Sequence, residues 1–145
     1  MIALLQRVST ASVDVSGERV AVIGSGLLVF VGVERDDQDA NAARLAERVL
    51  GYRVFADAAG RMNLSVKDVN GALLLVPQFT LAADTKKGTR ASFSSAAMPE
   101  KGQRLFDAFV ALVRQTDMVV ATGVFGADMS VTLTNDGPVT FWLSA

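Results

Sequence analysis

Two uninterrupted apolar runs, residues 27–33 and 72–76, constrain the fold of this chain more than any other feature of its sequence. A strand with one side in water alternates apolar and polar residues, whereas a short continuous apolar run is typical of a strand buried on both faces. We therefore predict that both runs are central strands with further structure packed on either side. The second run leads directly into residues 77–81 (PQFTL), so a polar stretch lies at the C-terminal end of a buried strand.

Shorter apolar stretches predict the outer strands, and turn residues separate them. These stretches are residues 2–8, 12–15, 20–23, 52–55, 119–122, 129–133 and 139–143. Two segments with helical periodicity interrupt the series. The resulting order, rich in strands with two inserted helices, predicts a mostly antiparallel or mixed sheet system with the helices on one face.

The first predicted helix begins at the acidic segment 36–39, where carboxylates favour the positive end of the helix dipole. It ends at Gly51, a residue suited to a left-handed C-cap. The second helix begins at residues 98–100, where Pro99 suits the first turn. The apolar faces are Ala42, Leu45, Ala46, Val49 and Leu50 in the first helix, and Leu105, Phe106, Phe109, Val110 and Val113 in the second. Faces with this spacing indicate core packing rather than a cofactor site.

The chain contains no histidine and no cysteine. This absence excludes a Ser-His-Asp triad, a Cys-His dyad, disulfide bonds and zinc sites that depend on either residue. Any catalysis must therefore use carboxylates, hydroxyls, lysine, tyrosine, backbone dipoles or groups on the substrate. We expect no cofactor and no metal.

The length of 145 residues predicts a single domain, residues 1–145, and the 50% of hydrophobic residues supplies a substantial core. No apolar run approaches the ~20 residues that cross a bilayer, and the N-terminal segment lacks the features of a signal peptide. We therefore expect a cytoplasmic protein. The net charge of −1 gives no general sign of nucleic-acid binding, so an RNA ligand would need a local basic patch.

Two polar segments allow both a structural and a functional interpretation. Residues 135–140 (NDGPVT) place Gly137-Pro138 directly before the last apolar run, and on spacing alone an ordinary hairpin turn is favoured. Residues 84–93 form a charged segment, which is usually solvated surface. Its cations are Lys86, Lys87 and Arg90.

Several motifs together resemble the D-aminoacyl-tRNA deacylase family, and the resemblance covers nearly the whole chain. Each motif alone is short, but the family's order and spacing are kept throughout, which makes the set far more specific than its members. The matching segments are residues 6–8 (QRV), 50–53 (LGYR), 62–64 (MNL), 78–85 (QFTLAADT) and 135–143 (NDGPVTFWL).

The resemblance implies an α/β fold: a β-rich, three-layer (β/β/α) domain with mixed or antiparallel sheets, barrel-like curvature and two helices on one face. It also implies a cytoplasmic homodimer that binds D-aminoacyl-tRNA at its 3′ acceptor end, with active sites at the subunit interface. The reaction would be hydrolysis of the ester that links a D-amino acid, or glycine mischarged onto the alanine tRNA, to the terminal ribose. This activity is chiral proofreading, and it involves no membrane.

The resemblance further implies roles for single residues. The catalytic residues would be Gln78, Phe79 and Thr80 of one subunit, with Gly137 and Pro138, joined by a cis peptide bond, from its partner. The substrate-binding residues would be Arg7, Pro77, Phe125, Met129 and Asn135. Among these, Arg7 would brace the Gly-Pro segment, and Phe125 and Met129 would shape the pocket for the terminal adenosine and the amino acid. The tRNA contacts would be Lys86, Lys87 and Arg90.

The chemistry of an aminoacyl ester fits a chain without histidine or cysteine. The ester is already activated and the ribose carries a neighbouring hydroxyl, so a site could orient water or that hydroxyl and stabilise the oxyanion with backbone N–H groups. Phe79 and Thr80 are the expected donors, and Gln78 is a positioning group. Thr80 as a covalent nucleophile is the alternative, although the sequence supplies no obvious base beside it. The main chain of Gly137-Pro138 would reject L side chains by collision, so specificity among D side chains would be broad.

One position departs from the family pattern, because Pro77 stands where the family usually has serine. A related deacylase branch that is more tolerant of L-alanine carries proline there, together with a small residue at the position of Phe79. This chain keeps Phe79 and the NDGPVT segment, so we expect the D-specific activity, with relaxed chirality as an alternative. Two other classes stay open: a threonine-nucleophile esterase or amidase acting on small D-amino-acid derivatives, and a non-catalytic RNA-binding module that uses the cations of residues 84–93.

Overall fold

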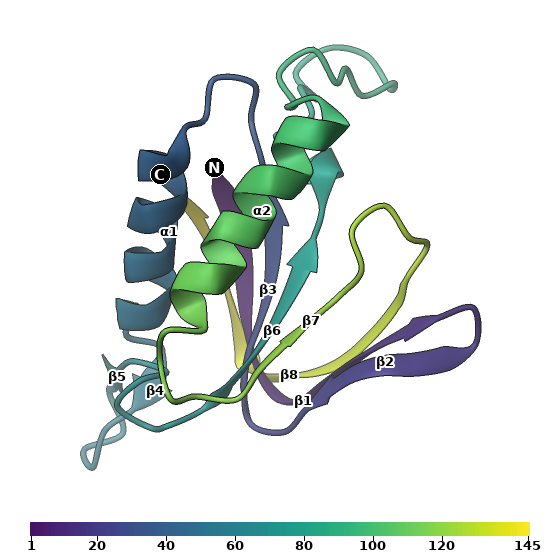
Figure 1. Cartoon of the computed structure of the whole chain (residues 1–145). Helices are drawn as coiled ribbons and strands as arrows, with labels where there is room; N and C mark the ends of the chain where they lie inside the picture. Colours follow the sequence, from purple (N-terminus) through teal and green to yellow (C-terminus); the bar gives the residue numbers. More distant parts are fainter.

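The structure, a computed structural model, describes residues 1–145, and Figure 1 shows its helices and strands. The first and last strands are the longest, and they pair with each other. The elements in chain order are β1 (Ile2–Val15), β2 (Glu18–Ile23), β3 (Gly26–Gly32), α1 (Asp39–Gly51), β4 (Phe55–Ala56), β5 (Met62–Leu64), β6 (Ala72–Pro77), the 3₁₀ helix η1 (Phe79–Ala82), α2 (Pro99–Val113), β7 (Val120–Thr122) and β8 (Ser130–Ser144).

Six strands form one mixed sheet that is nearly closed into a barrel. Its main path is β2-β1-β3-β6-β7, and β8 joins it by pairing with β1. The pairs made by β1 are antiparallel, whereas β3–β6 and β6–β7 are parallel. The helices α1 and α2 lie side by side on one face of the sheet, and β4 pairs with β5 in a separate two-stranded sheet. The predicted mixed, barrel-like sheet with two helices on one face is confirmed.

The central strands β3 and β6 are buried on both faces because their side chains enter two different hydrophobic cores. Leu73 and Leu75 of β6 belong to the larger core, which includes the buried faces of both helices. Leu74 and Val76 point the other way, into the smaller core that the curved sheet encloses with β1 and β2. The helices, the central strands and the outer strands are therefore the three layers of the fold. The prediction that two strands are buried on both faces is confirmed.

Both helices bury the predicted apolar faces, except that Leu50 at the end of α1 is half-buried, and α2 begins with Pro99, as predicted. The end of α1 differs from the prediction, because Gly51 is its last helical residue and is followed by Tyr52 in extended backbone, with φ −71° and ψ 126°. The left-handed C-cap at Gly51 is therefore wrong. The chain leaves the helix directly because the ring of Tyr52 packs edge-on against Phe141 of β8, with ring centroids 5.3 Å apart.

Two pairs of predicted strands are each one continuous strand in the structure. Residues 2–8 and 12–15 both lie in β1, and the last two predicted strands both lie in β8. The two long strands pair along most of their length, with register shifts on either side of Val8. Residues 135–138 are therefore a bend within β8, which we call the β8 corner, and the hairpin turn predicted there is wrong. A hairpin does not form because β1 pairs with β8 on both sides of the corner.

The region after α1 also differs from the prediction. The strand predicted at residues 52–55 is reduced to β4, which pairs with β5, a strand that the sequence analysis did not predict. Met62 and Asn63 of β5 are exposed, so this short strand has no buried face whose alternation could identify it. The turn between the strands predicted at residues 12–15 and 20–23 is shorter than the gap between them, because Glu18 already pairs with Val15.

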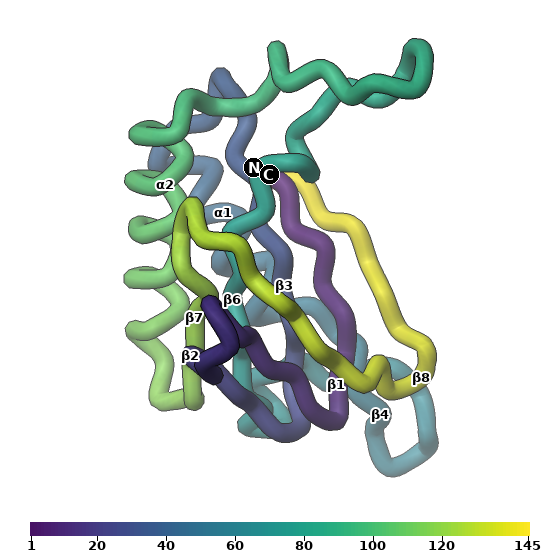
Figure 2. The backbone as a smooth tube through the Cα atoms, turned by 90° about the vertical axis from the view of Figure 1, so that its right-hand side faces the viewer, coloured from purple at the N-terminus to yellow at the C-terminus, as the bar shows by residue number.

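The two ends of the chain lie next to each other, as Figure 2 shows. The α-amino group of Met1 donates to the backbone O of Ala145 at 2.7 Å and pairs with Oδ1 of Asp37 at 2.5 Å. Both Met1 and Asp37 are buried, so this ion pair lies within the protein. None of the helices combines the length and the hydropathy that crossing a bilayer requires.

Candidate active site

A cavity of about 260 Å³ opens at the C-terminal ends of β3 and β6, beside the first turns of α2. None of its 11 lining residues has an ionisable side chain. The lining residues are Val31, Val33, Pro77, Gln78, Phe79, Ala97, Pro99, Gly102, Phe106, Phe125 and Gly126. A mostly apolar cavity with few polar groups suits a flat ring or an apolar side chain, which the polar groups then orient.

The 3₁₀ helix η1 places backbone donors at the edge of this cavity. The N–H of Gln78 donates to the O of Val31 at 2.8 Å, which fixes the start of η1 to the end of β3. The first i→i+3 bond of η1 is donated by Leu81 to the O of Gln78, at 3.3 Å. The N–H groups of Phe79 and Thr80 precede that bond, so they have no acceptor within the helix and can bind a ligand.

The side chains of Gln78 and Thr80 contact each other. Nε2 of Gln78 donates to Oγ1 of Thr80 at 2.6 Å. An amide N–H cannot take a proton from a hydroxyl, so this contact orients Thr80 without activating it as a nucleophile. The Thr80 hydroxyl keeps its own proton, which it can donate to a water molecule or a substrate oxygen.

The loop after β7 forms another wall of the cavity. Phe125 of this loop lines the cavity, and Met129 lies behind it, where its sulfur accepts the N–H of Val124 at 3.3 Å. Gly123 is closely surrounded, since a Cβ there would lie 2.7 Å from Sδ of Met129 and 3.4 Å from Cδ of Pro77. Pro77 and Met129 therefore pack at the start of the loop that carries Phe125, and Met129 does not itself line the cavity.

The β8 corner is exposed backbone that hydrogen bonds hold in one conformation. The peptide bond between Gly137 and Pro138 is cis. Gly137 has φ +151°, and a Cβ there would lie 2.7 Å from the backbone N of Val139, so only glycine fits. Oδ1 of Asn135 accepts the N–H of Val139 at 2.7 Å, and Nδ2 of Asn135 donates to the O of Val139 at 3.2 Å. The amide of Asn135 is thus used within the chain, across the corner.

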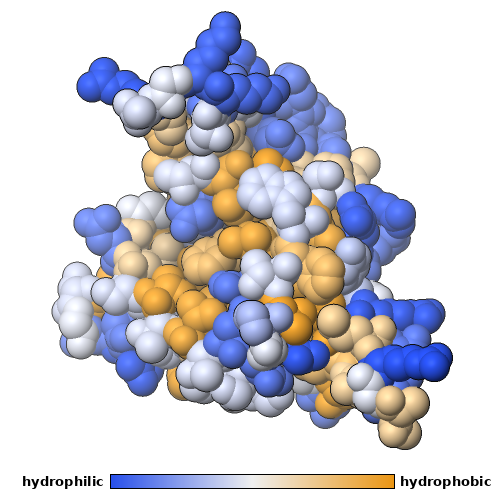
Figure 3. All heavy atoms as spheres, turned by 180° about the vertical axis from the view of Figure 1, so that it is seen from behind, coloured by the Kyte–Doolittle hydropathy of each residue, from blue (hydrophilic) through white to orange (hydrophobic).

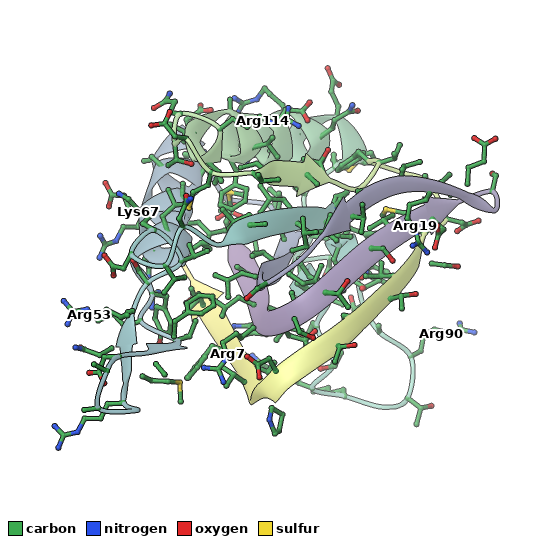
Figure 4. The ribbon with its side chains drawn as sticks, turned by 90° about the horizontal axis from the view of Figure 1, so that it is seen from below. Arg7, Arg19, Arg53, Lys67, Arg90 and Arg114 are labelled. Atoms are coloured by element: carbon green, nitrogen blue, oxygen red, sulfur yellow. The ribbon has the colours of Figure 1, made fainter.

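Arg7 of β1 holds the same corner from the neighbouring strand, as Figure 4 shows. Its Nε donates to the backbone O of Asp136 at 2.9 Å and lies 3.3 Å from Oδ2 of the same residue. Its Nη1 donates to the O of Val54 at 2.5 Å. The Arg7 side chain is only 16% exposed, so these contacts are largely shielded from water. Arg7 therefore contacts the corner at the position that the resemblance implies.

Within one chain, the structure brings together only part of the predicted site. Pro77, Gln78, Phe79 and Phe125 line the cavity, whereas Gly137 and Pro138 do not. The strand registers explain the separation, because Asn135 pairs with Val8 at the end of the sheet where β3 begins, and the cavity opens where β3 ends. Figures 1 and 2 show η1 and the β8 corner at opposite ends of the sheet. The corner is therefore free to contact another molecule.

The three predicted tRNA contacts, Lys86, Lys87 and Arg90, are all exposed. They lie on a loop that two hydrogen bonds close, from the N–H of Asp84 to the O of Ser92 at 2.8 Å and from the N–H of Ser92 to the O of Asp84 at 3.0 Å. Figure 4 shows Arg90 extending into solvent from this loop. The prediction of a solvated charged segment is confirmed.

Two ionisable groups with a shifted pKa lie away from the cavity lining. The side-chain hydrogen bond and the charge of Asp14 raise the pKa of Arg19 above its usual value. Hydrogen bonds from the backbone and side chain of Ser65 lower the pKa of Asp68. The electrostatic character of the cavity therefore comes from backbone dipoles and neutral side chains.

The wall that α2 contributes was not predicted from the sequence. Pro99, Gly102 and Phe106 line the cavity, although the apolar face of this helix was interpreted as core packing alone. That interpretation is confirmed for Phe106, which is also buried. The spacing of these three residues, three and four apart, places them on one helical face, and this signal could have identified the wall.

Comparisons with known proteins agree on one family. A family model described as D-Tyr-tRNA(Tyr) deacylase matches residues 4–144. A D-aminoacyl-tRNA deacylase of Thioalkalivibrio sulfidiphilus is 64% identical over 143 residues, which cover 99% of this chain and 96% of the relative. A protein of the same name from Escherichia coli K12 is 59% identical over 143 residues, which cover 99% of each chain.

Solved structures give the same fold. The c-Myc DNA Unwinding Element Binding Protein has a TM-score of 0.95 at 36% identity, over 100% of this chain and 99% of that one. A probable eukaryotic D-amino acid tRNA deacylase has a TM-score of 0.86 at 18% identity, over 99% of this chain and 98% of that one, and at this identity it supports the fold alone.

Relatives this similar over the full length place the protein among the enzymes that hydrolyse an aminoacyl ester. The chain belongs to the D-aminoacyl-tRNA deacylase family. The family predicted from the sequence motifs is confirmed.

Proposed function

We propose that the protein hydrolyses D-aminoacyl-tRNA and glycyl-tRNA at an active site that a second copy of the chain completes. The observation that carries the proposal is a cavity without any ionisable lining residue that opens beside the N–H groups of Phe79 and Thr80. A site of this kind must act by binding, orientation and oxyanion stabilisation, because no side chain in it can take up a proton at neutral pH. An activated ester is the substrate class that needs no more than this.

In the proposed reaction the terminal adenosine enters the apolar cavity against Phe125. The carbonyl oxygen of the ester then faces the N–H groups of Phe79 and Thr80. Water, which the neighbouring ribose hydroxyl helps to orient, adds to the carbonyl carbon, and the two N–H groups stabilise the negative charge that develops on the oxygen. When the intermediate collapses, the ester C–O bond breaks and the proton of the attacking oxygen passes to the ribose oxygen. Gln78 orients the Thr80 hydroxyl, which hydrogen-bonds the attacking group.

The β8 corner of the second copy is the proposed chiral filter. The corner is exposed, Arg7 and Asn135 hold it, and Gly137 presents bare main chain. If this main chain faces Cα of the substrate, an L side chain collides with it, whereas a D side chain or the hydrogen of glycine does not. Figure 3 supports an association of two copies, because apolar side chains gather at the centre of the face that lies away from the helices.

Lys86, Lys87 and Arg90 are the proposed contacts to tRNA phosphates. With so few cations the affinity should fall with salt along a shallow slope. We assign the activity to one deacylase domain, residues 1–145, that acts in the cytoplasm as a proofreading step of translation.

A deacylation assay tests this function. The substrates are tRNAs charged with D-Tyr, D-Phe, D-Asp, Gly, L-Tyr and L-Ala, together with the free methyl ester of D-Tyr. We expect comparable hydrolysis of the D-aminoacyl and glycyl esters, and no hydrolysis of the L esters or the free ester above background. Equal rates on D-Tyr and L-Tyr would contradict the chiral filter, and cleavage of L-Ala-tRNA alone among the L esters would indicate the branch with relaxed chirality. Rapid cleavage of the free ester would instead indicate a general esterase.

A further inference from the structure

Residues 92–95, which we call the support segment, lie against η1 and have no part in the reaction described above. The ring of Phe93 packs on the ring of Phe79, with centroids 5.2 Å apart and planes inclined by 41°. Oγ of Ser95 donates to the backbone O of Ala82 at 2.5 Å. The support segment therefore contacts both the first and the last residue of η1.

The support segment is tied to the body of the protein at its C-terminal end. Ser95 accepts the N–H of Arg35 at 2.9 Å through its backbone O, and Ala97, two residues later, donates to the O of Val33 at 3.0 Å. At the other end, Ser92 exchanges two backbone hydrogen bonds, of 2.8 and 3.0 Å, with Asp84, which follows η1 in the chain. The segment therefore connects η1 to the residues after β3 and can restrain it.

A restraint on Phe79 affects the candidate site, because Phe79 lines the cavity. Its side chain is 61% exposed, and η1 has only four residues. A 3₁₀ helix this short has poor hydrogen-bond geometry and little stability of its own, so contacts from outside must define its orientation. Phe93 is also 45% exposed, so the ring pair is not part of a hydrophobic core. Two exposed rings in contact beside the cavity indicate a local role in holding η1.

We propose that Phe93 is a positioning residue: through its contact with the Phe79 ring, it orients the N–H groups of Phe79 and Thr80 toward the substrate carbonyl. This inference rests on the proposed function, which assigns those two N–H groups to the oxyanion. Phe93 itself touches no reacting atom. A substitution of Phe93 should therefore change the rate at which the bound substrate reacts, kcat, rather than the affinity for the substrate.

The test compares Phe93→Ala, which removes the ring, with Phe93→Tyr, which keeps it. Each variant is assayed on D-Tyr-tRNA and on 3′-D-tyrosyl-adenosine, a minimal ester that cannot reach the cationic loop. We expect Phe93→Ala to lower kcat about tenfold on both substrates while KM changes less than about twofold, and Phe93→Tyr to restore kcat. Val22→Ala, which truncates another exposed apolar side chain at 57% exposure, should leave both constants unchanged.

Three results would overturn the proposal. An unchanged kcat in Phe93→Ala would show that the ring pair does not matter for the reaction. A higher KM on D-Tyr-tRNA alone, with kcat unchanged, would make Phe93 a tRNA contact. A loss of kcat that follows a loss of folded protein, and that Phe93→Tyr does not restore, would make the role purely structural.

Amide hydrogen exchange of η1 separates this inference from the proposed function. The exchange rates at Leu81 and Ala83, whose N–H groups donate to the O of Gln78 and of Thr80, should rise in Phe93→Ala and stay unchanged in Phe93→Tyr. If the wild-type chain cleaves neither ester, the proposed function fails, while faster exchange in Phe93→Ala would still establish that Phe93 holds η1. If the wild-type chain cleaves both esters and exchange is the same in all three proteins, only the positioning role fails.

Discussion

Thr80 is the residue at which the two possible mechanisms differ. As a covalent nucleophile it would need a base, but its hydroxyl contacts only the amide donor of Gln78, at 2.6 Å. As a main-chain donor it would act through its N–H, which a substitution of the side chain leaves in place. In that case the Thr80 hydroxyl contributes one hydrogen bond, and the backbone N–H groups contribute the larger part of the transition-state stabilisation.

The first prediction follows from this difference. Thr80→Val keeps the branched side chain and the N–H but removes the hydroxyl, so we expect kcat for D-Tyr-tRNA to fall less than about tenfold. Single-turnover kinetics measure this directly. A loss of about a thousandfold or more, together with an acyl-enzyme trapped on the wild-type protein, would establish the covalent mechanism instead.

The second prediction concerns pH and comes from the side chains that line the cavity. None of them is ionisable, so the enzyme should not add a titrating group to the reaction. We expect the enzymatic rate between about pH 5.5 and 8.5 to show no inflection other than that of the substrate amino group. The spontaneous hydrolysis of the same ester, measured in the same buffers, identifies the inflection that belongs to the substrate. A bell-shaped profile, or an inflection that the substrate does not show, would reveal a catalytic acid or base in the enzyme.

At the scale of elements, the β8 corner depends on the strand beside it. Arg7 of β1 reaches the backbone O of Asp136, and its side chain is 16% exposed. Arg19, also on the sheet, pairs with Asp14 at 3.0 Å, but its side chain is 57% exposed. The two arginines make similar ion pairs in different surroundings, so they form a matched pair for substitution.

The third prediction compares the substitution of Arg7 with that of Arg19. Arg7→Met should loosen the corner, so that D-Tyr-tRNA is cleaved more slowly and the preference for D over L falls by about tenfold or more, since the two hydrogen bonds that the charged guanidinium donates to Asp136 and Val54 are lost. Arg19→Met should change neither quantity, because exposed ion pairs contribute little. The measurement is the ratio of kcat/KM for D-Tyr-tRNA and L-Tyr-tRNA. The filter would need another explanation if both variants kept the wild-type ratio.

Much of the element structure could be predicted from local patterns. The apolar runs at residues 27–33 and 72–76 identified the central strands, and the periodic apolar residues identified both helices. The β8 corner could not be predicted, because glycine and proline there have the composition of a hairpin turn. Only the pairing of β8 with β1 on both sides shows a bend within one strand, and pairing partners are not visible in local sequence.

The candidate site could likewise be predicted only in part. Pro77, Gln78, Phe79 and Phe125 were expected in the site because the family resemblance implies roles for them, and all four line the cavity. The wall formed by α2 escaped prediction because Phe106 serves the core and the cavity together. The separation between the cavity and the β8 corner depends on strand register over the whole sheet, and local patterns do not contain it.

At the scale of the whole molecule, the two parts of the proposed site do not meet within one chain. The cavity and η1 lie where β3 ends, and the corner lies where β3 begins. A symmetric dimer can join the halves, because each subunit then offers its corner to the cavity of the other. This arrangement is the central claim of the account, since the chiral filter depends on it.

The fourth prediction tests that claim with two defective chains. Gly137→Ala places a Cβ 2.7 Å from the backbone N of Val139 and should distort the corner. Gly102→Phe places a ring in the cavity, which Gly102 lines. Gly51→Ala, where a Cβ meets no atom within 4 Å, is the control and should keep full activity. Each defective chain alone should be inactive on D-Tyr-tRNA while remaining folded by circular dichroism, because the ring at position 102 fills the cavity and the displaced main chain at position 137 obstructs the substrate.

The decisive measurement is the activity of the heterodimer, purified through different tags on the two defective chains. It contains one site with both defects and one site with an intact cavity from the Gly137→Ala chain and an intact corner from the Gly102→Phe chain. The account predicts about half of the wild-type rate, since one of two sites works. An inactive heterodimer, or a wild-type monomer that cleaves D-Tyr-tRNA at the full rate, would contradict it.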